Sequence, residues 1–179
     1  MAARGRVLTP MVAISGPSGV GKTRLLVRLI PLLRRRGITV AVIKHTGHRH
    51  GFDVPGKDTE VLRRAGAVAA AIEGPGGLAV FGPPAGGARA LARLLPPSDL
   101  VLAEGWRGEP LPRVEVHRRS VARTFLCAFD RRVFAVVSDE PPPRRLPTFH
   151  PDRLGPLADL LVARFVRPRP AGRRPPARS

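Results

Sequence analysis

The sequence predicts an α/β fold in which helices flank a mostly parallel, twisted sheet. Short apolar runs typical of buried strands alternate along the chain with longer amphipathic stretches typical of helices. The most informative segment follows the first expected strand, at 11–15, and reads Gly16-Pro17-Ser18-Gly19-Val20-Gly21-Lys22-Thr23. This segment lies between a strand and a helix, and its glycines and lysine indicate a site for phosphate.

The segment matches the phosphate-binding pattern G-x-x-x-x-G-K-[ST]. Its glycines allow a tight turn that aims backbone N–H groups at a phosphate, and the next helix adds its positive N-terminal end. We expect Lys22 to reach the β- and γ-phosphates and the Thr23 hydroxyl to hold Mg²⁺. A glycine-rich turn that merely caps a helix is the alternative. The context favours a P-loop NTPase-like domain over residues 1–166, with all eight residues from Gly16 to Thr23 contacting nucleotide.

The remaining elements follow from apolar periodicity and from glycine and proline positions. Pro31 is expected to kink or shorten the first helix, and Pro156 is tolerable only in the first turn of the last helix. In chain order we expect a helix at 21–36, a strand at 38–43 buried on both faces, a helix at 58–65 capped by Asp58, strands at 68–72 and 78–81, a helix at 85–95, a buried strand at 99–103, weaker strands at 113–117 and 125–128, a strong strand at 133–137, and a closing helix within 152–166.

The composition of the chain limits the classes of partner that it is expected to bind. Its 179 residues suit one domain, and the formal net charge of +18 favours polyanions such as nucleotides, phosphorylated cofactors, nucleic acid or an acidic protein. Residues 167–179 hold five Arg, four Pro and no acid, which predicts a disordered basic tail. Aromatic residues make up only 4 %, and no nucleic-acid-binding motif is visible, which argues against nucleic acid as the ligand.

The same composition predicts a cytoplasmic protein without a membrane anchor. No apolar run approaches the roughly 20 residues that a membrane-spanning helix needs. No signal peptide is visible, because the first apolar stretch runs straight into the phosphate loop. The single cysteine, Cys127, fits a reducing compartment.

A second candidate site residue ends the expected strand at 99–103. Glu104 follows this strand directly, and ligands of parallel sheets lie beyond the carboxyl ends of the strands. If the strand neighbours 11–15, Glu104 emerges beside the phosphates, where it can hold Mg²⁺ through water or orient a water molecule. A solvated carboxylate at a strand end is the alternative.

A polar cluster follows the expected strand at 38–43. Lys44 and His45 begin it, and we expect both to face the phosphates. Three histidines within 45–50 allow a metal site, but the cationic composition and the lack of a neighbouring cysteine favour a phosphate-facing loop. Asp53 is placed like the switch aspartates of nucleotide hydrolases, near metal and water, although it can equally be a turn residue.

Asp139 follows the strong strand at 133–137, where many phosphate-loop proteins recognise the base. A carboxylate can accept two hydrogen bonds from N1–H and the 2-amino group of guanine, a pair that adenine lacks. Asp139 is therefore our candidate for guanine recognition, with a simple loop aspartate as the alternative.

Taken together, these motifs resemble those of the molybdopterin-guanine dinucleotide biosynthesis protein B (MobB) family. The resemblance covers about 11–165 and depends most on Lys44-His45-Thr46 and Pro55-Gly56-Lys57-Asp58. Further matching segments are Leu62-Arg63-Arg64-Ala65-Gly66-Ala67, Leu102-Ala103-Glu104-Gly105-Trp106 and Leu111-Pro112-Arg113-Val114-Glu115-Val116-His117-Arg118. Two departures from the family pattern are Gly47, where a further histidine is common, and Trp106-Arg107, where Phe-Lys is more usual.

The resemblance implies a GTP-binding accessory protein of molybdenum cofactor biosynthesis. Such a protein acts with the guanylyltransferase that joins GMP to molybdopterin, forms homodimers, and is at most a weak GTPase. A small-molecule kinase of the same fold class is the alternative, with 118–123 as a cationic lid over the transferring phosphoryl group. A nucleic-acid-binding protein is suggested by charge alone.

Overall fold

A computed structural model describes residues 9–47 and 52–167. Its centre is a six-stranded sheet in which every pairing between the described strands is parallel, as the sequence predicts. In spatial order the strands are β2 (Val40–Lys44), β5 (Leu100–Glu104), β1 (Met11–Ser15), β6 (Arg113–Val116), β7 (Val133–Val137) and β8 (Thr148–Phe149). The carboxyl ends of β2, β5, β1 and β6 therefore lie next to one another at a single edge.

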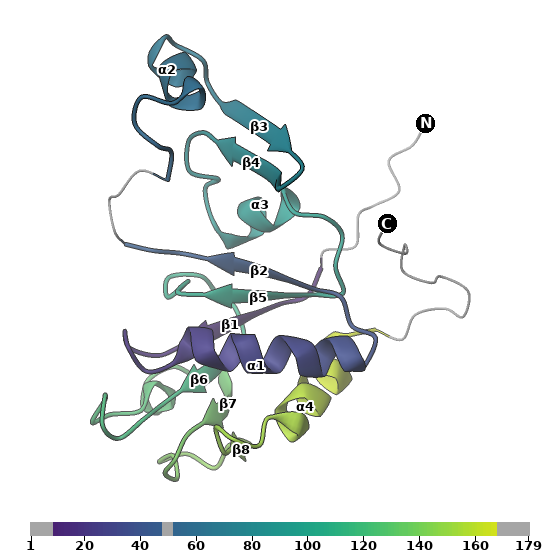
Figure 1. Cartoon of the computed structure of the whole chain (residues 1–179). Coiled ribbons are helices and arrows are strands. Elements are labelled where there is room, and N and C mark those ends of the chain that lie inside the picture. Colours follow the sequence, from purple (N-terminus) through teal and green to yellow (C-terminus); the bar gives the residue numbers. More distant parts are fainter. Residues whose placement is uncertain (1–8, 48–51, 168–179) are drawn as a thin grey trace.

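Helices cover both faces of this sheet (Figure 1). On one face, α1 (Lys22–Arg35) and α4 (Gly155–Phe165) pack against each other and over the strands. Side chains alternate along β1, so that Val12 and Ile14 join Leu29 and Leu33 in this core. Met11 and Ala13 point to the opposite face, which α3 (Ala88–Arg93) partly covers. Full burial of leucines such as Leu29 contributes about 1.5–3 kcal/mol each.

A small lobe lies beside the edge strand β2 (Figure 1). It consists of α2 (Asp58–Arg64) and an antiparallel hairpin of β3 (Ala70–Gly74) and β4 (Gly77–Phe81). We call residues 52–84 the hairpin lobe. In the described chain its two strands pair only with each other, so this sheet is separate from the six-stranded one.

Several expected elements differ in detail. The segment at 125–128 is not a strand, because residues Leu126–Ala128 form a short 3₁₀ helix, η1, beneath which Glu115 is buried. The Glu115 carboxylate accepts hydrogen bonds from the backbone N–H groups of Leu126, at 2.5 Å, and of Cys127, at 2.8 Å. These bonds hold the backbone in a turn that a strand cannot adopt.

Other differences concern strand edges and helix ends. The strand expected at 38–43 to be buried on both faces is the edge strand β2, where β5 is its single partner among the described strands and the side chain of Val42 is exposed. Asp58 is the first residue of α2 rather than its cap, which is Lys57. Pro31 lies inside α1 without ending it, and α4 begins at Gly155, with Pro156 in its first turn as expected.

Strand β8 was not expected from the sequence. None of the helices in the described ranges is long and apolar enough to cross a membrane. The basic tail expected at 167–179 lies, apart from Arg167, outside the described residues, and so do His48 and His50 of the histidine-rich segment.

Candidate functional site

The phosphate loop connects β1 to α1 and needs glycine at defined positions. Gly16 has a φ of 147°, and a Cβ atom there would lie 2.4 Å from the Val116 carbonyl oxygen. Gly21, with a φ of 100°, precedes the first residue of α1. These left-handed conformations strain any residue with a side chain, so the pattern of glycines follows from the turn itself.

Lys22 lies across this loop. Its Nζ donates to the carbonyl oxygens of Gly16, at 3.1 Å, and Pro17, at 2.7 Å. Burial lowers the pKa of the Lys22 ammonium; Glu104 opposes this shift, and the positive charges of Arg107 and Lys44 add to it. A nearby anion would relieve this unfavourable environment, as expected of a lysine that binds phosphate.

Glu104 lies where the sequence places it, beside the phosphate loop. Strand β5 is a direct neighbour of β1, with Ile14 opposite Glu104. Glu104 is only 7 % exposed, and both of its carboxylate oxygens lie 3.0 Å from Thr23 Oγ1, which donates to the carboxylate. A hydroxyl and a carboxylate in contact form an oxygen pair of the kind that Mg²⁺ prefers. The alternative of a solvated strand-end carboxylate is therefore wrong for Glu104.

Strand β2 brings Lys44 and His45 to the same edge. Lys44 lies opposite Glu104 in the register of β2 and β5, and its Nζ is 3.6 Å from Glu104 Oε1. The backbone N–H of His45 donates to the Glu104 carbonyl at 2.8 Å, and its ring lies 4.9 Å from that of Trp106. Gly105 has a φ of 85° and allows this close approach.

Two further arginines reach the phosphate loop: Arg107, which was not expected there, and Arg118, which was expected near the phosphates only as part of the cationic lid of the kinase alternative. Arg107 Nη2 donates to the Gly16 carbonyl at 3.2 Å. The Arg118 guanidinium lies about 3.7 Å from the position of a Cβ at Gly21. Both arginines lie within three residues after a strand that ends at the site edge, and this position was the only sequence signal for Arg107.

Asp53 and Asp139 lie away from this cluster of contacts. The Asp53 carboxylate binds within the hairpin lobe, accepting from Thr59 Oγ1 at 2.8 Å and from Arg63 at 3.3 Å. Asp139 is exposed just beyond β7, which β6 separates from β1. Their roles in metal binding and guanine recognition remain predictions. No group of three or more His, Cys, Asp or Glu side chains within 9–47 and 52–167 is arranged to hold a metal.

The cluster combines four cations with one oxygen pair. The cations, supplied by four segments, are Lys22, Lys44, Arg107 and Arg118, and the oxygen pair is Thr23 with Glu104. The four cations and the loop N–H groups are suited to bind a polyphosphate. The oxygen pair is suited to bind a divalent cation that accompanies it. This combination of cations and oxygen ligands is therefore chemically suited to a polyphosphate with a divalent cation.

Comparison with known proteins gives a consistent family. The sequence model of molybdopterin guanine dinucleotide synthesis protein B, MobB, matches residues 11–139. The chain is 36 % identical over 144 residues to the molybdopterin-guanine dinucleotide biosynthesis adapter protein of Escherichia coli (strain K12), covering 76 % of this chain and 82 % of that protein. The adapter protein of the same name from Haemophilus influenzae (strain ATCC 51907 / DSM 11121 / KW20 / Rd) is 36 % identical over 136 residues, covering 74 % and 76 %.

A solved structure agrees with the sequence relatives. The crystal structure of a molybdopterin-guanine biosynthesis protein B (mobB) superposes with a TM-score of 0.66 at 27 % identity, covering 86 % of this chain and 98 % of that one. The family match spans the phosphate loop, Glu104 and the strands that place them. The chain therefore belongs to the MobB family.

Proposed function

We propose that this chain binds GTP with Mg²⁺ and acts as an adapter in molybdenum cofactor biosynthesis, alongside the guanylyltransferase that joins GMP to molybdopterin. The observation that carries the proposal is the contact between Thr23 and Glu104 beside a phosphate loop spanned by Lys22. Relatives named as adapter proteins for molybdopterin-guanine dinucleotide biosynthesis support the pathway.

In the proposed complex the loop N–H groups and Lys22 hold the β- and γ-phosphates. Thr23 and, through water, Glu104 would hold Mg²⁺, which would neutralise part of the phosphate charge. Lys44, Arg107 and Arg118 neutralise the remaining charge. Asp139 recognises guanine, and any hydrolysis is slow, with Glu104 as the residue that would orient water. The protein works in the cytoplasm, where its one thiol stays reduced.

We also propose that the chain forms a homodimer through the hairpin lobe. The lobe exposes a set of large apolar side chains, Phe52, Val54, Val61, Leu62, Val68, Ile72, Leu78 and Val80. A two-stranded sheet with exposed apolar side chains is marginal by itself and favours association. The lobe carries three basic and four acidic side chains in a chain of net charge +18. A second copy can therefore meet it without the repulsion expected elsewhere.

Calorimetry tests nucleotide binding. GTP and ATP are titrated with and without Mg²⁺ into the full chain and into an Asp139→Asn variant. We expect tighter binding of GTP than of ATP, an advantage that Asp139→Asn reduces, and weaker binding of GTP without Mg²⁺. Equal affinity for both nucleotides would contradict the assignment of GTP. Affinity capture from cells should retain the guanylyltransferase, and its absence from the captured proteins would contradict the adapter role.

Light scattering tests the dimer. Leu78→Asp places a charge on the exposed face of the hairpin lobe and should give a monomer that still binds GTP. Val27→Asp changes an equally exposed apolar residue on α1, outside the lobe, and should leave the dimer intact. A Leu78→Asp protein with the mass of a dimer would contradict the proposed interface.

A further inference from the structure

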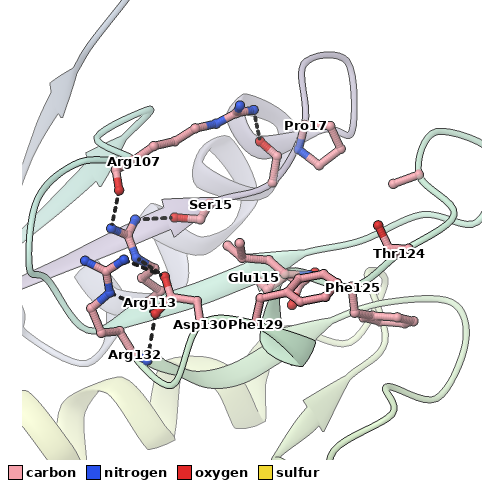
Figure 2. Close-up of a pocket in the computed structure, with 13 residues that line it drawn as sticks. Ser15, Pro17, Arg107, Arg113, Glu115, Thr124, Phe125, Phe129, Asp130 and Arg132 are labelled. Carbon is pink, nitrogen blue, oxygen red and sulfur yellow. Dashed lines mark hydrogen bonds and ion pairs between the residues drawn. The ribbon is translucent and has the colours of Figure 1, made fainter.

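A pocket lies beside the phosphate loop on the sheet face opposite α1. Its floor is polar. Ser15 of β1 lies opposite Glu115 of β6, and Arg113, two residues before Glu115, points to the same face of the sheet. The intervening residues Ile14 and Val114 point the other way, into the core beneath α1. Figure 2 shows these floor residues together with the side chains around them.

Hydrogen bonds fix the floor in place. The Arg113 guanidinium donates to Ser15 Oγ at 3.0 Å and to the carbonyls of Arg107, at 2.7 Å, and Glu109, at 2.6 Å. Its Nε lies 3.0 Å from Asp130 Oδ2. Glu115 is held by the backbone N–H groups of η1. The floor is thus preorganised, and a ligand need not order it on binding.

The walls combine cations with aromatic rings around a volume of about 520 Å³, within the range of small-molecule sites. Gly16 and Pro17 of the phosphate loop form one side, and Arg107 reaches over it (Figure 2). Arg132 and Phe129 line the other side of the pocket, and the Phe129 side chain is 76 % exposed.

Charge in the pocket favours an anion. Glu115 is satisfied by two backbone N–H groups, and Asp130 is paired with Arg132 at 2.8 Å as well as with Arg113. Arg107 contributes a further positive charge, and its guanidinium contacts a carbonyl rather than a carboxylate. The lining holds three arginines against two carboxylates, so positive charge is in excess here.

We propose that this pocket binds a flat, phosphorylated heterocycle as a second ligand beside the nucleotide, with the ring against Phe129 and the anionic group between Arg107 and Arg132. The assignment of this heterocycle as a pterin rests on the proposed function, because molybdopterin is a pterin phosphate. Arg107 contacts the phosphate loop and lines the pocket, so it connects the two sites. The adapter would thereby hold both reactants of the nucleotide transfer on one edge of the sheet.

Fluorescence titration tests the pocket with neopterin monophosphate as the probe, added to the full chain saturated with Mg·GTP. Neopterin, which lacks the phosphate, and inorganic phosphate are the comparison ligands. We expect saturable binding of the probe and at least tenfold weaker binding of either comparison ligand. Phe129→Ala should weaken binding of the probe about tenfold, because the probe loses stacking on an aromatic ring. Leu94→Ala, which shortens a similarly exposed large apolar side chain outside the pocket and the hairpin lobe, should change nothing.

The outcomes separate the pocket from the nucleotide site. No saturable binding of the probe, with normal binding of Mg·GTP, would overturn the pocket alone. Loss of the probe as GTP is added, with no effect of Phe129→Ala, would show that it occupies the phosphate loop and would also overturn the inference. Failure of GTP itself to bind would refute the proposed function. In that case the pocket is tested without nucleotide: weaker binding of the probe in Phe129→Ala would support it, and unchanged binding would contradict it.

Discussion

Replacing Glu104 by Gln tests the role of the negative charge at the centre of the proposed nucleotide site. The side chain keeps its size, and its amide oxygen can still accept from Thr23 Oγ1. What is lost is a carboxylate in contact with that hydroxyl and 3.6 Å from Lys44 Nζ. The fold should tolerate the change, because Lys44 is 61 % exposed and an ion pair of this kind contributes at most about 1 kcal/mol.

The expected effect on nucleotide binding depends on Mg²⁺. A water on the metal that donates to a carboxylate makes a charge-assisted hydrogen bond, which contributes about 1.5–3 kcal/mol. Its loss should weaken Mg·GTP by about 10- to 100-fold, at about 1.4 kcal/mol for each factor of ten. Without metal, the effect of Glu104→Gln on affinity should be absent or opposite. The Glu104 carboxylate then only repels the phosphates, so its neutralisation should leave GTP affinity equal or higher.

Paired titrations of GTP with Mg²⁺ and with EDTA measure this difference. Thermal unfolding of the same samples should show a decrease in Tm of no more than about 2–4 °C, which corresponds to about 1 kcal/mol in a domain of this size. Glu73→Gln, on the exposed hairpin strand β3, is the matched control and should alter neither affinity. Equal losses with and without Mg²⁺ in Glu104→Gln would refute the placement of Glu104 at the metal.

Three further outcomes concern stability and reactivity. Hydrogen bonds from Arg132, together with the charge of Arg113, lower the pKa of the Asp130 carboxyl. Its contribution to stability is therefore present above the usual pKa and is lost as the pH falls through the lower folded value, so Asp130→Asn should flatten the loss of stability below about pH 4 in acid titrations. Burial raises the pKa of Cys127 to about 11, so iodoacetamide at about pH 8 should label it only after unfolding, and rapid labelling of the native protein would contradict its burial. Deletion of 167–179 should change the free energy of unfolding by less than about 0.5 kcal/mol, keep GTP binding and weaken polyanion binding; a large decrease in Tm would show that the tail packs on the domain.

The sequence predicted the part of the site that depends on local patterns and on one rule of topology. The phosphate loop carries its glycines in order, and an apolar run ending in Glu104 is typical of a buried parallel strand. Because ligands lie at the carboxyl ends of such strands, adjacency of β5 to β1 was enough to bring Glu104 to Thr23. Lys44 reached the site by the same rule through β2.

The rest depends on contacts between distant residues. Phe125 and its neighbours have strand-like composition, but Glu115, eleven residues before Leu126, binds their backbone and forms η1. Strand β8 spans only two residues, Thr148 and Phe149, so no alternating pattern could identify it. Arg107 approaches the loop because the connection after β5 turns back at Gly105 toward Gly16. Hydrophobic periodicity does not reveal such contacts between distant segments. The pocket that these segments line could not be predicted from the sequence for the same reason.

The most direct measurement is a calorimetric titration of Mg·GTP into the full chain and into Lys22→Ala. The Lys22 ammonium donates to loop carbonyls, so its removal should leave the fold intact, as thermal unfolding can verify. Arg34→Ala removes an exposed positive charge from the far end of the same helix and is the matched control. We predict that Lys22→Ala abolishes measurable binding of GTP while Arg34→Ala binds as the unmodified chain does. Unchanged affinity in a folded Lys22→Ala protein would contradict the assignment of this loop as the nucleotide site.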